Sequence, residues 1–163
     1  MSKTFLISFV IGIVVIGAGI GAIFYKQRGN HIEPNGSILK VRTAKLDDAN
    51  SVAIAEVRLS NNANFAMVAR DINVSIITGN GEAAGHVIVG VDAKTIFKNY
   101  PELGEQFNPV FDMRGEVPPH SSIDREILAS FTIPVTDLDQ RKDLIVRIED
   151  VTGPVTELHE RRK

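Results

Sequence analysis

The sequence predicts a mainly β protein, in which a single N-terminal transmembrane helix precedes one β-sandwich domain. Three observations lead to this prediction. Residues 5–25 form a run of 21 residues without a charged side chain. After this run, apolar and polar residues alternate in most segments, with the period of half-buried strands. Turn-forming residues separate about seven such segments, and short strands at this spacing are typical of a β-sandwich.

The apolar run predicts an uncleaved membrane anchor over residues 1–26. At about 1.5 Å per residue, a helix of this length spans roughly 31 Å, the thickness of a bilayer's hydrocarbon core. The run is longer than the apolar core of a cleaved signal peptide, which is about 7–15 residues. The chain contains no cysteine, which excludes a lipid-modified N-terminal cysteine and any disulfide.

The positive charge on the two sides of the anchor is almost equal, so it does not decide the orientation in the membrane. Lys3 precedes the apolar run, and Lys26 and Arg28 follow it, while positive residues prefer the cytoplasmic side. A short N-terminal tail before a signal-like helix usually delivers the following domain across the membrane. We therefore expect a single-pass protein of the plasma or inner membrane with an extracytoplasmic (periplasmic) domain.

Small residues recur one helical turn apart in the anchor. Gly17 and Gly21 form one pair, and Ala18 and Ala22 form a parallel pair. Such pairs let a second helix approach closely, which makes these four residues candidates for a helix–helix contact. Glycine is also common in membrane helices for no such reason. The expected partners are the lipid bilayer and either other membrane subunits or a second copy of the chain.

A polar linker over residues 27–36 leads to the predicted sandwich at residues 37–160, and a basic tail covers 161–163. The part after the apolar run has 17 basic and 20 acidic residues, a net charge of −3 (17 − 20). This near balance disfavours nucleic-acid binding, which usually needs a basic face. The tail is interpreted either as a solvated end or as a contact with anionic lipid heads.

The first half of the domain contains four predicted strands. They are Ser37–Arg42, Val52–Ser60, Arg70–Thr78 and Glu82–Val91. In the second strand, the spacing of the apolar residues indicates either a bulge or burial on both faces. The third alternates cleanly, with Ile72, Val74 and Ile76 on one face, and Gly79-Asn80-Gly81 after it predicts a tight hairpin. The returning strand is expected to bury Val87, Val89 and Val91.

The alternation stops at Asp92–Tyr100, where we predict one short helix. Asp92 is its expected N-cap, Ile96 and Phe97 point inward, and Pro101 ends it. The stretch from Pro101 to Val117 is expected to be irregular, with Phe107 and Phe111 closing one end of the core.

The second half of the domain contains the remaining strands. Ile123–Ile133 alternates well, Thr136–Lys142 is a short connection, Leu144–Ile148 is a further strand and Val155–Leu158 is an edge strand. The tryptophan and cysteines of antibody domains are absent. The prediction is therefore the broader immunoglobulin- or fibronectin-like sandwich of about seven strands with one inserted helix.

Three elements between residues 37 and 150 carry a distant family resemblance. They are a strand ending in the Asn-rich turn 57–64, an alternating strand with a glycine turn, and the Pro-Pro-x-Ser-Ser entry at 118–122. This layout resembles the water-stress (late-embryogenesis-abundant type 2) domain and bacterial anchored domains of unknown function. The chain has Asn61-Asn62-Ala63-Asn64 where the water-stress pattern prefers Asn-Pro-Asn, and the predicted helix would be an insertion. The resemblance implies a binding or structural module and carries over no catalytic residue.

No motif in the sequence predicts catalysis, a cofactor or a metal. The histidines at 31, 86, 120 and 159 have no metal-ligand spacing. Asp137, Asp139 and Asp143 do not match a calcium loop. Nucleophile-elbow, Walker and dinucleotide glycine patterns are absent as well. We therefore name no catalytic, cofactor-binding or metal-binding residue.

The sequence leaves three classes of function in order of preference. The first is protein–protein contact by an accessory or scaffolding subunit of a membrane complex. The second is a free-standing anchored module that binds a ligand or an envelope component. The third is an anchored enzyme, because catalytic pairs can be assembled in space without a sequence motif. A large exposed apolar patch would favour the first class, and a deep pocket with converging polar groups would favour the others.

Overall fold

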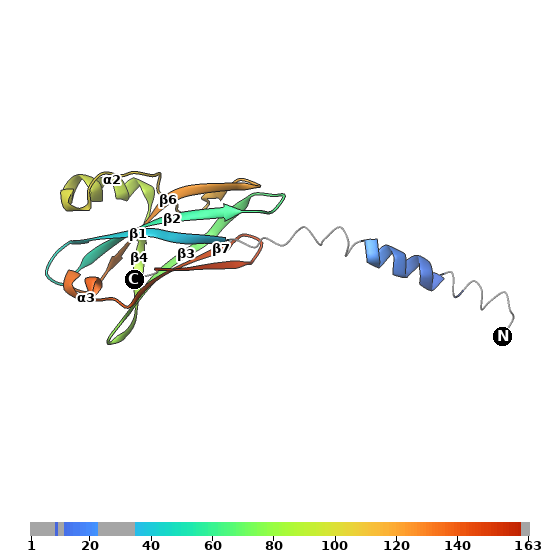
Figure 1. Ribbon diagram of the computed structural model, residues 1–163, viewed down its shortest axis with the longest axis horizontal. Helices are drawn as coiled ribbons and strands as arrows, with labels where there is room; N and C mark the ends of the chain where they lie inside the picture. Colours follow the sequence, from blue (N-terminus) through green and yellow to red (C-terminus); the bar gives the residue numbers. More distant parts are fainter. Residues whose placement is uncertain (1–8, 10–11, 23–34, 161–163) are drawn as a thin grey trace. The chain divides into compact units, whose positions relative to one another are not determined.

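The computed structural model describes residues 9, 12–22 and 35–160 (Figure 1). The chain divides into two units, residues 1–31 and 32–163. In the first unit, residues 12–22 form an α-helix. Among the described residues, no helix is long and apolar enough to cross a bilayer. Most of the predicted anchor, all but the last two residues of the predicted linker and the whole basic tail lie outside the described residues, so these assignments stay predictions.

The second unit is built from eight antiparallel strands in one continuous sheet that folds into a near-closed sandwich. The strand order is β1-β2-β6-β4-β3-β7-β8, and β5 pairs with β3 beside this path. One layer contains β1, β2 and β6, and the other contains β3, β7 and β8. The strands are β1 (Asn35–Lys45), β2 (Ser51–Asn61), β3 (Met67–Thr78), β4 (Gly81–Ile88), β5 (Glu116–Val117), β6 (Ser121–Phe131), β7 (Asp143–Asp150) and β8 (Val155–His159).

Alternating apolar residues of both layers form the main core, as the sequence predicts. In β3 and β7 the inward residues are those expected from the period of two, and all of them are buried. Phe111 and Phe131 fill the space between the layers. The inward residues of β3 and β7 are Ile72, Val74, Ile76, Leu144, Val146 and Ile148.

Strand β2 is buried on both faces. The spacing of its apolar residues therefore reflects burial on both faces and not a bulge. Val52 and Ile54 face away from the main core and pack in a second, smaller core with Leu128 of β6. Helix α2 (Gly90–Asn99) and the 3-10 helix η1 (Pro101–Leu103) cover this face. The bulges lie elsewhere: the register shifts in β1 between Ile38 and Lys40, and in β3 between Ala69 and Asp71.

The hairpin after β3 is confirmed. Thr78 pairs with Gly81, so Gly79 and Asn80 are the two turn residues. Gly81, and not Asn80, has the positive φ, at +117°. Glycine tolerates this angle without a Cβ penalty.

The returning strand and the helix after it differ from the prediction. Strand β4 ends at Ile88, and α2 begins at Gly90, two residues before the expected start. Val89 is the N-cap and Asp92 lies in the first turn, so Asp92 is not the cap. Val89 and Val91 are 39% and 81% exposed rather than buried. The strand pattern fails here because the chain turns into the helix as soon as β4 leaves the sheet.

The remaining differences concern Phe107 and short elements. Phe107 is 63% exposed, so it does not close the core, whereas Phe111 is buried as expected. Helix α3 (Val135–Asp139) occupies the predicted connection and starts after Pro134, and β5 lies in the stretch predicted to be irregular. Strand β1 starts at Asn35, two residues earlier than expected. Short elements of this kind form through packing against the core and leave little periodicity in the sequence.

Candidate functional site

The four predicted helix-contact residues lie together on the helix of residues 12–22, and all are exposed. Residues four apart lie on one helix face, so Gly17 and Gly21 form one strip and Ala18 and Ala22 an adjacent one. A Cβ at Gly17 or Gly21 would meet no atom within 4 Å. The strip is open to close approach by another helix, and the contact itself stays a prediction.

Exposed apolar side chains gather on one segment of the sandwich unit. We call residues 89–115 the insertion; it carries α2, η1 and the loop that follows them. Of the seven large apolar side chains exposed in the described part of this unit, the insertion holds four. They are Val89, Val91, Phe107 and Met113, whereas Leu39, Val151 and Val155 lie elsewhere in the chain. Val89 and Met113 also lie together in space, because both line the groove described below. Exposed apolar side chains that lie together mark contact surfaces.

A buried ion cluster fixes the insertion to the sheet. Arg42 of β1 donates from Nη2 to Oε1 of Glu126 on β6 at 2.7 Å, and its Nε lies 3.1 Å from Oε1 of Glu56 on β2. Its Nη1 donates to the backbone oxygens of Leu103 and Glu105 in the insertion. Oε1 of Glu126 also accepts the N–H of Phe107 at 3.0 Å. Arg42 and Glu126 therefore each bind both the sheet and the insertion.

The cluster is largely buried. The side chain of Glu126 is fully buried and that of Arg42 is 10% exposed. Burial raises the pKa of Glu126, and the Phe107 N–H and the Arg42 guanidinium oppose this rise. The rings of Phe97 and Phe107 lie 5.6 and 5.0 Å from the guanidinium carbon, within cation–π range. This geometry suits a structural role, in which the cluster holds the insertion against the sheet.

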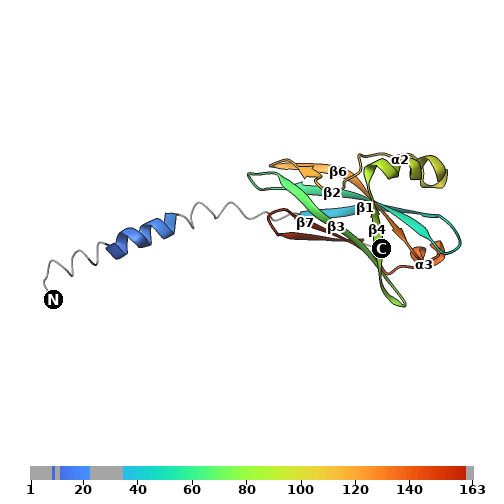
Figure 2. The same ribbon diagram turned by 180° about the vertical axis from the view of Figure 1, so that it is seen from behind.

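A groove opens where β4 changes partners. The last pair between β3 and β4 is Val74 with Gly85, and the next residue, His86, pairs with Ser130 of β6. Both ribbon views show β3 and β4 diverging from their hairpin (Figures 1 and 2). The cavity between them has a volume of about 240 Å³; we call it the strand-split groove. Its lining residues are Asp71, Ile72, Asn73, Gly85, His86, Val87, Val89, Asp112 and Met113.

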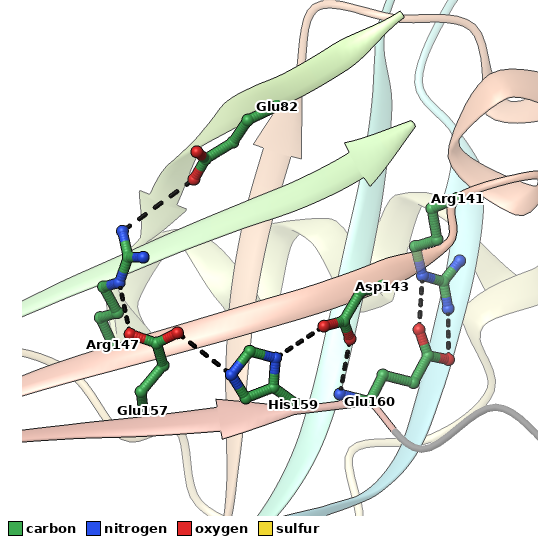
Figure 3. Close-up of polar contacts among 7 residues, drawn as sticks. All are labelled: Glu82, Arg141, Asp143, Arg147, Glu157, His159 and Glu160. Atoms are coloured by element: carbon green, nitrogen blue, oxygen red, sulfur yellow. Dashed lines mark hydrogen bonds and ion pairs between the residues drawn. The ribbon is translucent and has the colours of Figure 1, made fainter. Parts of the chain in front are cut away.

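A polar ladder runs along the outer faces of β7 and β8 (Figure 3). His159 Nδ1 lies 2.6 Å from Oδ2 of Asp143, and its Nε2 lies 3.0 Å from Oε1 of Glu157. Arg147 donates to the same Glu157 at 2.9 Å. Next to this row, Arg141 forms two hydrogen bonds to the carboxylate of Glu160, at 2.8 and 2.7 Å.

The ladder has the chemistry of an ion-pair network. Both ring nitrogens of His159 face carboxylates, so the protonated ring, which donates from both nitrogens, is the favoured form. The hydrogen bond to Asp143 and the nearby negative charges raise the pKa of His159. A histidine held in this way is poorly placed to accept a proton as a general base.

The histidines and acidic residues considered in the sequence as metal ligands take part in separate contacts in the described part of the chain. In the described part of the chain, no three His, Asp or Glu side chains could jointly hold a metal ion. His86 lines the groove, His120 bonds Asn64 and His159 belongs to the ladder. Asp143 binds His159 and Asp139 accepts a hydrogen bond from Thr43, so the acidic residues near 140 serve separate contacts. His31 lies outside the described residues.

The sequence did not reveal the ion cluster or the groove. Arg42, Glu56 and Glu126 carry charges inside segments that otherwise read as strands, and a charged residue facing a covered surface is a signal that could have been used. The groove left no signal in the sequence, because it depends on β4 switching its pairing from β3 to β6.

Comparison with known proteins adds little to this geometry. The chain matches no protein-family model and no curated protein, so no family match supports the water-stress resemblance. Its fold resembles an uncharacterized β-sandwich protein from Clostridium difficile 630, with a TM-score of 0.37 and 11% identity over 80% of this chain and 82% of that one. It also resembles the archaellum periplasmic stator protein FlaG from Sulfolobus acidocaldarius, with a TM-score of 0.36 and 10% identity over 78% and 99%. Similarity at this level carries no inference about function.

Proposed function

We propose that this chain is a single-pass, membrane-anchored module, with an immunoglobulin- or fibronectin-like sandwich that serves protein–protein contact outside the bilayer. In the preferred form it is an accessory or scaffolding subunit of a membrane complex. The uncharged run of residues 5–25 would anchor it. The Gly17/Gly21 strip would contact a neighbouring helix, and the sandwich would bind a partner on the extracytoplasmic side.

The observation that carries this proposal is the apolar character of the insertion. Val91, Phe107 and Met113 are 81%, 63% and 58% exposed on a segment that the buried Arg42 cluster binds at Leu103, Glu105 and Phe107. A fixed surface with exposed apolar side chains suits a docking partner, because little ordering entropy is lost on binding. A loose loop with the same residues would bind more weakly.

The deciding experiment is native purification. Full-length protein would be extracted from its own membranes in mild detergent and analysed by size exclusion with mass spectrometry. We expect it to elute with a defined set of membrane proteins. Elution alone, as a monomer or a dimer, would refute the subunit proposal.

A matched pair of variants tests the contribution of the helix. Gly21→Leu places a large side chain on the Gly17/Gly21 strip, and Gly19→Leu places the same side chain on the other side of the helix. Among the described residues, a Cβ at either position meets no atom within 4 Å, so the two variants are matched in their local space. We expect Gly21→Leu to reduce co-elution and Gly19→Leu to leave it unchanged. Equal effects would exclude a specific small-residue contact.

Elution without partners would favour the second candidate, an anchored ligand-binding module. Two polar grooves favour this candidate. One, of about 420 Å³, lies beside the Thr78–Ala83 hairpin and Lys142, and the other, of about 470 Å³, lies between the start of β1 and the end of β8. Their volumes fall within the range of small-molecule sites, roughly 300–1,000 Å³.

A further inference from the structure

We propose that the strand-split groove binds an extended segment of a partner protein, which joins the sheet as an added strand along β3 at Asp71–Asn73. This inference rests on the proposed function and names the surface that performs it. The segment should alternate apolar side chains with others that include a lysine or arginine.

The edge of β3 is open at this point. On one side, Asp71–Asn73 pair with Glu149, Ile148 and Arg147 of β7. On the other side, pairing with β4 ends at Val74. The insertion loop covers the edge only at Ala69, which accepts from the N–H of Arg114 and donates to the oxygen of Gly115. Among the described residues, no strand pairs with Asp71–Asn73 on this side.

The facing edge of β4 is open as well. His86–Ile88 pair with β6 on one side and have left β3 on the other. Peptide groups of a strand point to each side at alternate residues, so each wall offers the backbone donor and acceptor of every second residue to a chain lying between them. Main-chain hydrogen bonds of this kind give β-augmentation its affinity.

The rim supplies the apolar part of the site. Val89 and Met113 are 39% and 58% exposed beside the groove, and Val87 is half-buried within it. In an extended segment every second side chain points the same way. One or two apolar side chains of the segment can therefore reach this rim while the backbone pairs with β3.

The acidic side chains of the groove favour a partner segment with positive charge. Asp71 and Asp112 line the groove, and no lysine or arginine is among its lining residues. Oδ2 of Asp112 accepts the Gly90 N–H at 3.2 Å, and Oδ2 of Asp71 accepts from Asn73 at 2.7 Å. Neither of these donors is a cation. Two copies of this chain would bring like charges together, which disfavours a self-association at this site.

The open strand edges favour a polypeptide over a small molecule. A helix presents no free backbone groups along its length and could not use the open edges. An extended segment is the occupant that uses the edges, the apolar rim and the carboxylates together.

The test is selection of linear peptides on the full-length protein. Protein in lipid nanodiscs would be panned with a phage-displayed library of random peptides, with the double variant Val89→Lys/Met113→Lys as the counter-target. Val151→Lys is the matched control, because it changes an exposed valine outside the groove and insertion. We expect peptides that alternate apolar residues with lysine or arginine, and binding weakened at least about tenfold in the counter-target but unchanged in the control.

Hydrogen exchange then checks the mode of binding. The best peptide should slow exchange of amides in residues 71–73 or 86–88, and N-methylation of its central residues should abolish its binding. The proposal is overturned if no peptide prefers the wild type to the counter-target, if the selected peptides are acidic, or if N-methylation has no effect. Partners found by native purification together with a failed selection would leave the proposed function standing and exclude this surface alone.

Discussion

Replacing Arg42 with methionine should destabilise the sandwich unit strongly, because two carboxylates then lose the buried cation that they share. Methionine keeps much of the side-chain volume between Phe97 and Phe107 and removes the charge. Glu126, which is fully buried, loses its 2.7 Å hydrogen bond to Nη2, and Glu56 on the neighbouring strand loses its 3.1 Å contact with Nε. Since Glu56 and Glu126 are directly paired across β2 and β6, their repulsion is no longer compensated.

The magnitude follows from two routes that agree. Breaking a buried ion pair by removal of one partner typically costs about 3–5 kcal/mol. Alternatively, Glu126 can escape the penalty by taking up a proton. Keeping a carboxyl with an ordinary pKa near 4.3 neutral at pH 7 costs about 3–4 kcal/mol, at about 1.4 kcal/mol per pH unit. We therefore expect the free energy of unfolding to fall by about 3–4 kcal/mol at pH 7.

Proton uptake by Glu126 also predicts how the loss of stability in Arg42→Met depends on pH. A carboxyl whose pKa is raised in the folded state binds a proton more readily in that state, so its penalty vanishes as pH falls to its unfolded pKa. The difference between Arg42→Met and wild type should thus shrink towards pH 4.5. Adding Glu126→Gln should restore much of the loss at pH 7, because a neutral amide needs no cation. Urea unfolding of the full-length protein, followed by circular dichroism of the strands, measures each value. A loss below about 1 kcal/mol, or one independent of pH, would refute this account of the cluster.

Two further predictions concern His159 in the polar ladder and Gly85 in β4. Because the pKa of His159 is raised, its stabilisation is fully present below the unfolded pKa near 6.5 and is lost as pH rises through the folded value. His159→Gln should therefore lower stability at pH 5.5 by less than about 1 kcal/mol, since the ring is half exposed, and should have no effect at pH 9 in urea unfolding. Gly85→Ala should lower the unfolding free energy by about 1–3 kcal/mol, because its Cβ would lie 2.7 Å from the Phe131 ring. Gly79→Ala, whose Cβ meets nothing within 4 Å, is the control, and equal losses would contradict the steric argument.

Elements with an uninterrupted period of two were predictable from the sequence. The inward residues of β3 and β7 follow strictly from alternation, and the hairpin between β3 and β4 follows from its glycine-rich turn. These features depend on near neighbours in the chain. The β-sandwich class followed from their number and spacing.

Features that depend on distant neighbours were not predictable in the same way. Val89 and Val91 continue the alternation of β4, yet the chain has already left the sheet, because β4 ends at Ile88 and α2 begins at Gly90. Phe107 looks like a core residue, but the buried guanidinium of Arg42 holds it at the surface by a ring contact. In both cases tertiary contacts override the local pattern, and the residues misplaced by the sequence are three of the four exposed apolar side chains of the insertion.

The strand-split groove is a consequence of how the sandwich closes. To join the two layers, β4 must pair with β3 at its start and with β6 at its end, and the crossing leaves part of each strand without a neighbour. Proteins normally cover or charge such edges, because an open strand recruits other chains. Here β5 covers Met67–Val68, and the insertion loop covers Ala69. The edge of β3 is no longer covered at Asp71. Beside this open part of the edge, Met113 and Val89 make the rim of the groove apolar. The insertion thus shields one part of the edge and leaves next to it an open strand, an apolar rim and two carboxylates, the combination that a selective strand-docking site requires.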